Sequence, residues 1–435
     1  MKIFKTLSRL SNVTILLSMA AIMFFDRCSK SKSNPAPVTP VAITSLSVNT
    51  GPYTTPVVIT GTGFSTTLAN NQVFFNGKAA TITAATSTQI TTTVPLGAGT
   101  GNVTISVNSA AAVMGPVFTY QLAAFVSTLA GKADTSGSAN GTGNQATFYT
   151  PTGIAVDVNG NVFVADLNNN LIREISPRGV VSTFAGSGNI GTTNGTGTAA
   201  SFYQPYVLTI DASGNLYVAE GTGDARKITP QGVVSLLPGS ASAFAVPNGI
   251  AIDSAKNVYV SDYQTNLIIK ITQAGTESVV AGNGIGNVNG KGTGASFHYP
   301  AGMAADASGN IYIADGENNL IRKMTPDGTV TTFAGSGNNA HADGTGTGAS
   351  FRVPWGLAFD AAGNLYVADR GDGRIRKITS AGVVTTVAGN GTTATVNGIG
   401  TNASFYDPYA LAVDTKGNIY VADGLANTVR KIVIQ

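Results

Sequence analysis

Residues 360–389 read DAAGNLYVADRGDGRIRKITSAGVVTTVAG, and the chain repeats this pattern with variations in five other places. The six copies align on their opening aspartates, which are Asp157, Asp211, Asp253, Asp306, Asp360 and Asp414, spaced 54, 42, 53, 54 and 54 residues apart. Each copy holds four short runs of strand-forming residues, separated by turn sequences such as Asp-x-x-Gly-Asn and Thr-Pro-x-Gly. Four strands per copy and six copies predict an all-β protein with a six-bladed β-propeller.

The two ends of the repeat region predict how the ring closes. The last copy stops at TVRKIVIQ (428–435), after its third strand, whereas AFVSTLAG (124–131) stands alone before the first copy and matches the fourth-strand sequence GVVSTFAG (179–186). Pairing these segments would close the ring and remove two exposed strand edges. Through their G-N-x-Y-V-A-D and I-R-K-I motifs, residues 122–435 resemble the NHL repeat family, which implies a six-bladed propeller.

Residues 41–121 form a separate unit with alternating strand-forming residues and turn signals such as Asn76-Gly77. A unit of about 80 residues of this kind predicts a small antiparallel sandwich. It resembles the TIG (IPT) immunoglobulin-like family over its whole length, through ITGTGF (59–64), VFFNGKAA (73–80), TQITTTVP (88–95) and GPVFTY (115–120). Domains of that family usually act as spacers or interaction modules, so the resemblance implies a spacer.

The first 28 residues differ from the rest. Lys2, Lys5 and Arg9 precede a 13-residue apolar run, VTILLSMAAIMFF (13–25), which is short for a membrane span and typical of an export signal. The lone cysteine that follows, Cys28, resembles the lipid-modified cysteine of bacterial lipoproteins, although Arg27 stands where that pattern has a small residue. We therefore expect export to the cell envelope, with a lipid anchor, an uncleaved N-terminal anchor or secretion as alternatives. Residues 29–40 read as a flexible tether.

Composition narrows the possible functions. Charged residues make up only 11% of the chain, and the net charge of +3 is spread without a basic block, which argues against nucleic-acid binding. Two histidines, His298 and His341, lie in different loops and leave almost no soft metal ligands. Asp, Asn and Gly in the loops would suit calcium, but HADGTGTG (341–348) has too few acids to count as a calcium-binding repeat. We expect a monomer.

Residues that recur in nearly every copy are predicted to be structural. The aspartate that opens each copy should shape the hairpin between its first two strands, and the aspartate of V-A-D should cap the next turn. Four Arg-Lys pairs should bond to such aspartates at blade junctions; these are Arg226-Lys227, Arg322-Lys323, Arg376-Lys377 and Arg430-Lys431.

A binding site should instead lie where the copies differ. The turns between strands two and three share one face with the 4–1 loops, which connect the fourth strand of one blade to the first strand of the next. One 4–1 loop, residues 237–247, is shortened and should leave a notch in the rim. Two series of positions ring the channel mouth on this face. The x of P-x-G is Thr152, Tyr206, Asn248, Ala301, Trp355 or Tyr409, and the residue after the second-strand acid is Leu167, Gly221, Tyr263, Gly316, Arg370 or Gly424.

From these series we predict a ligand site at Trp355, Tyr409, Arg370, Tyr206, Tyr263 and Asn248. Aromatic rings beside Arg and Asn suit a glycan or a hot spot for a surface protein. The alternative is that the rings only plug the channel.

Three functions remain open. The first is non-catalytic binding at the cell envelope, with the TIG domain as a spacer. The second is a metal-dependent enzyme, because six-bladed relatives include lyases and lactonase-like hydrolases, a likeness of fold only. The third is a purely structural adhesion or scaffold protein.

Overall fold

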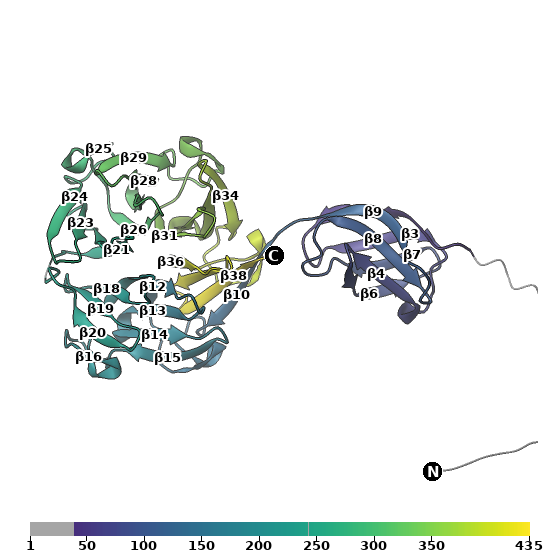
Figure 1. The fold of residues 1–435 in the computed structure, drawn as a ribbon, viewed down its shortest axis with the longest axis horizontal. Helices are drawn as coiled ribbons and strands as arrows, with labels where there is room; N and C mark the ends of the chain where they lie inside the picture. Colours follow the sequence, from purple (N-terminus) through teal and green to yellow (C-terminus); the bar gives the residue numbers. More distant parts are fainter. Residues whose placement is uncertain (1–38, 242) are drawn as a thin grey trace, which may run out of the picture.

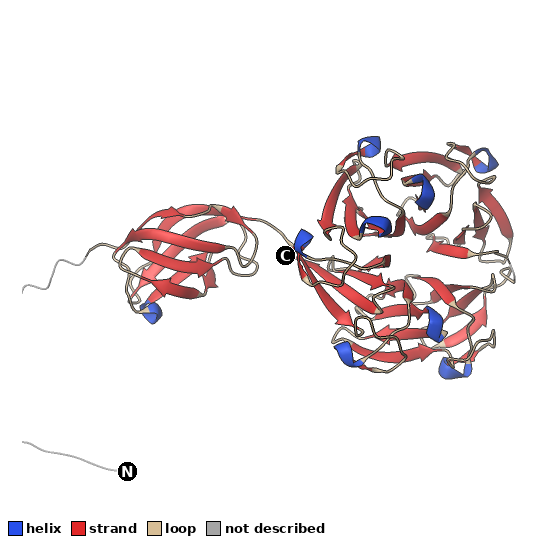
Figure 2. Ribbon diagram, turned by 180° about the vertical axis from the view of Figure 1, so that it is seen from behind, coloured by secondary structure: helices blue, strands red, loops and turns tan. Residues whose placement is uncertain are grey.

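The computed structural model describes residues 39–241 and 243–435, which form two β-domains (Figures 1 and 2). The predicted export signal, Cys28 and most of the tether lie outside the described residues. Within the described part of the chain, no helix is long and apolar enough to cross a membrane.

The N-terminal domain is a sandwich of two sheets. One sheet has the order β1 (Ala42–Leu46), β3 (Pro56–Thr62), β7 (Gln89–Thr93), β6 (Ile82–Ala85). The other has the order β2 (Thr50–Gly51), β9 (Val113–Tyr120), β8 (Gly101–Val107), β4 (Asn71–Phe75), β5 (Lys78–Ala80), and a 3-10 turn, η1 (Leu68–Asn70), precedes β4. Alternate residues such as Val57, Ile59 and Ile105 are fully buried between the sheets, as the sequence alternation predicts.

The C-terminal domain is a six-bladed propeller, which confirms the predicted fold class (Figure 1). Four strands build each blade from the channel outward. Blade one has β12 (Pro151–Val156), β13 (Val162–Asp166), β14 (Leu171–Ile175) and β15 (Val180–Ala185), and blade two has β17 (Pro205–Ile210), β18 (Leu216–Glu220), β19 (Ala225–Ile228) and β20 (Val233–Leu236). Blade three has β21 (Pro247–Ile252), β22 (Val258–Asp262), β23 (Leu267–Ile271) and β24 (Glu277–Ala281), and blade four has β26 (Pro300–Ala305), β27 (Ile311–Asp315), β28 (Leu320–Met324) and β29 (Thr329–Ala334). Blade five has β31 (Pro354–Phe359), β32 (Leu365–Asp369), β33 (Arg374–Ile378) and β34 (Val383–Ala388), and blade six has β36 (Pro408–Val413), β37 (Ile419–Asp423), β38 (Thr428–Ile434) and β10 (Ala124–Ala130).

Ring closure occurs as the sequence predicts. Strand β10, from the front of the repeat region, pairs antiparallel with β38 at the C-terminus, with Phe125 opposite Val433. Two backbone hydrogen bonds between Ala123 and Gln435, of 2.9 and 3.0 Å, extend this pairing to the last residue. The C-terminus therefore lies at the junction between the two domains (Figure 1).

Five blades gain a fifth, outer strand that the sequence analysis did not predict. Each is a two-residue segment of the preceding 4–1 loop; they are β11 (Gly141–Thr142), β16 (Gly195–Thr196), β25 (Gly290–Lys291), β30 (Gly344–Thr345) and β35 (Gly398–Ile399). A short 3-10 turn follows each of these strands; the five turns are η2 (Gly143–Gln145), η4 (Gly197–Ala199), η5 (Gly292–Gly294), η7 (Gly346–Gly348) and η9 (Gly400–Asn402). Three more 3-10 turns connect the second and third strands of blades one, four and five; they are η3 (Leu167–Asn169), η6 (Gly316–Asn318) and η8 (Arg370–Asp372). Blade three, which follows the short loop, has four strands among the described residues.

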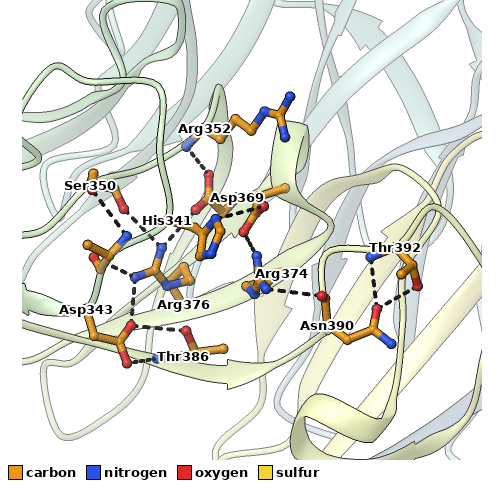
Figure 3. A network of polar contacts seen from close by, with 12 residues as sticks. His341, Asp343, Ser350, Arg352, Asp369, Arg374, Arg376, Thr386, Asn390 and Thr392 are labelled. Carbon is orange, nitrogen blue, oxygen red and sulfur yellow. Dashed lines mark hydrogen bonds and ion pairs between the residues drawn. The ribbon is translucent and has the colours of Figure 1, made fainter.

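A buried arginine on the third strand holds each long loop. Figure 3 shows Arg376 of blade five between Asp369 of β32 and Asp343, the residue before β30. Its guanidinium donates to Asp369 at 2.9 Å, to Asp343 at 2.8 Å and to the carbonyl of Ser350 at 3.1 Å. Blade three, with its short loop, has Ile269 at the equivalent position. The arginine and the fifth strand thus occur together.

These contacts test the structural roles predicted for the repeated residues. Asp157 accepts hydrogen bonds from the backbone N–H groups of Asn159 and Asn161, which confirms that it shapes the first hairpin. The arginines do pair with the V-A-D aspartates, but within one blade rather than between blades.

The predicted cap is present in some blades and takes two forms. In blades one and four, the carboxylates of Asp166 and Asp315 accept from the side-chain amides of Asn169 and Asn318 in the following turn, each at 2.8 Å. Asp166 also accepts from the backbone of the preceding loop, at Tyr149, and not from the backbone of the turn. In blade three the prediction holds, because Asp262 lacks an arginine and accepts from the turn N–H groups of Gln264 and Thr265.

The first strand of every blade lines a central channel, with a cavity of about 290 Å³. Close packing of these strands explains the glycine of the P-x-G motif. A Cβ added at Gly356 would lie 2.6 Å from the Cα of Ala410 in the next blade, so a larger residue would push the blades apart.

Candidate functional site

A second cavity, of about 370 Å³, lies at one end of the channel, and we call it the mouth pocket. It lies on the face that carries both the 4–1 loops and the turns between strands two and three, as expected. Its lining is Thr150, Thr152, Leu167, Tyr206, Val246, Asn248, Tyr263, Trp355, Arg370, Asp407, Tyr409 and Leu425. All six residues predicted from the sequence lie in this one pocket, although they come from four different blades.

Three rings at the x of P-x-G form the floor. Trp355 and Tyr409 are only 6% and 5% exposed, and their ring centroids lie 5.5 Å apart in an edge-to-face arrangement. The hydroxyl of Tyr206, from blade two, forms a hydrogen bond with the hydroxyl of Tyr409, from blade six. Trp355 and Tyr409 belong to the buried apolar cluster of blades four and five, and Tyr206 packs against it. All three rings line the mouth pocket, and none of them lines the channel cavity. They are therefore structural, and they also present a surface to the pocket.

An ion pair sits on this floor. Arg370 donates through Nε to Asp407 at 2.6 Å, and its guanidinium lies 4.7 Å from the ring centroids of both Trp355 and Tyr409. Burial opposes the charge on Arg370, but the hydrogen bond and negative charge of Asp407 outweigh it and raise the pKa of Arg370. Arg370 stays cationic and the pair as a whole is close to neutral.

Asp407 is a pocket residue that sequence reasoning missed. It stands just before the proline of P-x-G, where the other copies have uncharged residues, namely Thr150, Gln204, Val246, Tyr299 and Val353. A comparison of this position among the six copies would have identified Asp407, because it is the only charged residue there. Its partner Arg370 is 37 residues earlier and on the neighbouring blade.

The wall beside blade three is aromatic and polar. Tyr263 stacks on Tyr299 with centroids 4.1 Å apart and planes 9° from parallel, and it lies 6.0 Å from the Trp355 ring. Burial raises the pKa of Tyr263, so its hydroxyl is protonated at neutral pH and can donate. Asn248 is 2% exposed and accepts a long hydrogen bond of 3.5 Å from the Tyr409 hydroxyl.

One donor in the pocket lining has no partner. The indole Nε1 of Trp355 is buried and makes no hydrogen bond with any described residue. Buried donors in proteins are nearly always paired, so this unpaired N–H is an exception, and it belongs to a residue that lines the pocket.

Neither histidine lines the pocket. His298 lies against the far side of Tyr299, with ring centroids 4.7 Å apart, and His341 is a largely exposed loop residue 3.5 Å from Asp372. In residues 39–241 and 243–435, no group of three or more His, Cys, Asp or Glu side chains is placed to hold a metal ion.

Comparisons with known families agree with this architecture. The IPT/TIG domain model matches residues 40–120, the NHL repeat model matches 148–175 and 351–378, and the teneurin NHL domain model matches 192–343. Among curated proteins, SUPPRESSOR OF QUENCHING 1 of Arabidopsis thaliana is 29% identical over 57% of this chain and 26% of its own length. Human NHL repeat-containing protein 2 is 27% identical over 55% of this chain and 40% of its own. The chain thus spans less than half of these relatives.

Several solved structures match across both domains. An auxiliary nutrient binding protein from Bacteroides ovatus superposes with a TM-score of 0.64 at 19% identity, covering 91% of this chain and 98% of the other. A protein of unknown function from Bacteroides thetaiotaomicron gives 0.62 at 22% identity, with 92% and 99% covered. At these identities the likeness concerns the fold.

Proposed function

We propose that this chain, which joins an IPT/TIG domain to an NHL-repeat propeller, is an exported, non-catalytic protein that captures a neutral glycan in the mouth pocket. The observation that carries the proposal is the combination, in one cavity, of aromatic side chains and an Arg370–Asp407 ion pair. The name of the Bacteroides ovatus structure, an auxiliary nutrient binding protein, is consistent with a binding role in a related fold.

The chemistry of the pocket suits a sugar. The apolar C–H face of a pyranose stacks on aromatic rings, and its hydroxyls need donors and acceptors at the ring edge. Tyr206 and Tyr263 offer partly exposed rings, Asp407 offers acceptor oxygens, and the protonated Tyr263 hydroxyl offers a donor. Because Arg370 is already paired with Asp407, a charged sugar would have no free counter-ion among these groups.

The remaining parts of the proposal concern location. An export signal and a lipid on Cys28 would place the protein at the cell envelope, and the sandwich domain would act as a spacer. A Cys28→Ala variant should move from the membrane fraction to the soluble fraction without losing ligand binding. Membrane association that persists in this variant would favour the uncleaved N-terminal anchor instead.

The test of glycan capture is affinity gel electrophoresis of residues 39–435 against soluble starch, levan, laminarin, xyloglucan, galactan and mannan. We expect retardation by one class of neutral polysaccharide. Trp355→Phe, which puts a smaller ring at the floor of the pocket, and Asp407→Asn, which removes the partner charge of Arg370, should weaken retardation. Val158→Ala, at a 76% exposed position on the hairpin of the opposite face, should not.

Circular dichroism of each variant separates loss of binding from loss of fold. Because Trp355 is the only tryptophan in the chain, its fluorescence reports on the pocket directly. No retardation by any of these polysaccharides, with the fold intact, would contradict glycan capture and point to a protein partner.

A further inference from the structure

Three exposed tyrosines stand outside the mouth pocket at equivalent positions of consecutive blades. Tyr406, Tyr149 and Tyr203, which we call the tyrosine arc, each follow the buried phenylalanine of a 4–1 loop as it leads into blades six, one and two. Their exposed fractions are 39%, 45% and 37%. The other three blades have Ala245, His298 and Arg352 at this position, so the aromatic rings gather on one half of the face.

The arc is held on a rigid base. The backbone N–H of Tyr149 donates to the buried carboxylate of Asp166 at 2.7 Å. The N–H groups of Tyr203 and Tyr406 donate in the same way to Glu220 and Asp423, each at 3.0 Å. Each carboxylate is in turn paired with a buried arginine of the same blade. A ring presented from such a fixed point loses little conformational freedom on binding.

The ring of Tyr203 is also held by a contact with the chain. A Cβ added at Gly221 would lie 3.2 Å from two ring carbons of Tyr203 and 3.2 Å from the side-chain oxygen of Gln204. The ring therefore packs over the turn at Gly221, which shields part of it and leaves the remainder in solvent.

The arc is continuous with the mouth pocket. Thr150 and Asp407, the residues directly after Tyr149 and Tyr406, both line the pocket, and so do Leu167 and Leu425 from the adjacent turns. Leu425 is 55% exposed. The pocket lining therefore adjoins the arc at blades six and one, where consecutive residues of the chain belong to each.

We propose that the tyrosine arc is a row of outer subsites, and that the glycan is a chain longer than the mouth pocket can hold. One end of the chain fills the pocket, and the following sugar units stack on Tyr406, Tyr149 and Tyr203. This inference rests on the glycan function proposed above and specifies its substrate as an oligosaccharide or polysaccharide.

The chemistry of the arc favours a sugar chain over other occupants. The three tyrosines precede the first strands of three different blades, so they offer three rings from separate elements, whereas a protein interface or a membrane surface requires a contiguous apolar patch. Individual aromatic rings suit a polymer of repeating units that stack one at a time. None of the three is an acidic or basic residue type, in keeping with the paired charges of Arg370 and Asp407 in the pocket.

Isothermal titration calorimetry with saccharides of increasing length tests the inference. The probes are the monosaccharide, disaccharide, tetrasaccharide and hexasaccharide of whichever polysaccharide in the panel retards the protein. We expect the wild type to bind the hexasaccharide at least about tenfold more tightly than the disaccharide, as one or two added stacking contacts would give. Tyr149→Ala/Tyr406→Ala should remove that gain and leave disaccharide affinity unchanged. Tyr149→Phe/Tyr406→Phe, which keeps the rings, should retain it.

The outcomes separate this inference from the proposed function. If the disaccharide binds but affinity neither rises with length nor falls in the double alanine variant, the arc is not a binding surface and glycan capture by the pocket stands. If no polysaccharide or saccharide of any length binds the folded protein, both proposals are wrong. Ile190→Ala, at a 67% exposed position on a 4–1 loop, should bind all probes as the wild type does.

Discussion

The arginine of the third strand shows how one residue type joins a blade to its loop. In blade five, Arg376 pairs with Asp369 and also lies 5.3 Å from the ring centroid of Phe351, so it links strand two, strand three and the loop. Where Ile269 replaces this arginine, the loop is short and Asp262 is satisfied by backbone N–H groups instead. The arginine and the long loop therefore occur together for a physical reason, since the guanidinium binds the strand-two acid and the loop at once.

We predict that Arg376→Ile destabilises the propeller by about 3–5 kcal/mol, because it leaves the carboxylate of Asp369 buried without its counter-ion. Urea unfolding followed by circular dichroism measures this loss. The double variant Arg376→Ile/Asp369→Asn also removes the unpaired charge, so it should recover part of the lost free energy of unfolding. Lys377→Ala, which removes a cation 5.9 Å from the ring centroid of Tyr366, should change stability by less than about 1 kcal/mol. Equal losses in both single variants would contradict the assignment.

The second-strand tyrosines make stability depend on alkaline pH. Burial, together with the negative charge and hydrogen bond of Asp211, raises the pKa of Tyr217 to about 12, and Tyr259 beside Asp253 behaves alike. An unfolded tyrosine ionises near pH 10. Because the folded phenols hold their protons longer, we predict that the free energy of unfolding falls as pH rises from about 10 to about 12.

Urea midpoints across that range measure the fall. Tyr217→Phe/Tyr259→Phe removes two of the responsible groups and should flatten the dependence. An unchanged slope in this variant would show that other groups control alkaline stability.

Sequence comparison found the pocket because the repeat puts equivalent positions in register. Trp355, Tyr409 and Arg370 stood out as departures at two such positions, and the structure places them within contact of one another. Asp407 and Tyr406 were missed because they lie just before the proline, a pair of positions that was not compared. The orphan Trp355 N–H could not be predicted at all, since it depends on side-chain orientation.

Strand number and ring closure were predictable at the scale of elements, because each depends on a run of several residues. The fifth strands were not, since two residues such as Gly344–Thr345 carry no hydrophobic periodicity. In the blades that have them, a buried arginine of the third strand binds the loop just before the fifth strand. Blade three has Ile269 at that position, and among the described residues of the loop 237–247 no strand pairs with the outer edge of β24.

Removal of residues 430–435 should unfold the propeller cooperatively. The deletion takes away most of β38 and leaves both β37 and β10 with an unpaired edge in the middle of blade six. We expect loss of the propeller's thermal transition in calorimetry. Replacement of residues 337–340 by Gly-Ser, in a 4–1 loop, should leave that transition in place. A truncated protein with a normal propeller transition would show that the ring tolerates an open seam.

At the scale of the whole molecule, the two domains have separate cores. The sandwich core is built from residues between Val57 and Phe118 only, with partly buried neighbours from 41 to 120, and each propeller cluster is built from residues after 123. The linker is three residues, 121–123, and a contact between the rings of Tyr53 and Phe125, with centroids 5.6 Å apart, crosses the junction. Each core is therefore built from its own continuous stretch of the chain.

We therefore predict two thermal transitions in calorimetry, of which the sandwich transition survives the deletion of residues 430–435. A Gly-Ser insertion between residues 121 and 122 should preserve both transitions and the affinity of the mouth pocket. Small-angle X-ray scattering should detect a larger range of distances between the domains after this insertion. A single transition that shifts with the insertion would show that the domains fold as one unit.

The pairing of β10 with β38 also sets an order of events during synthesis. The first strand of the propeller leaves the ribosome about 300 residues before its partner, since β10 begins at Ala124 and β38 at Thr428. No prefix of the chain that lacks β38 can complete the ring, so the propeller stays open until that strand has been made. A chain that terminates before β38 keeps an unpaired edge on β10, and such an edge is open to aggregation and to proteases.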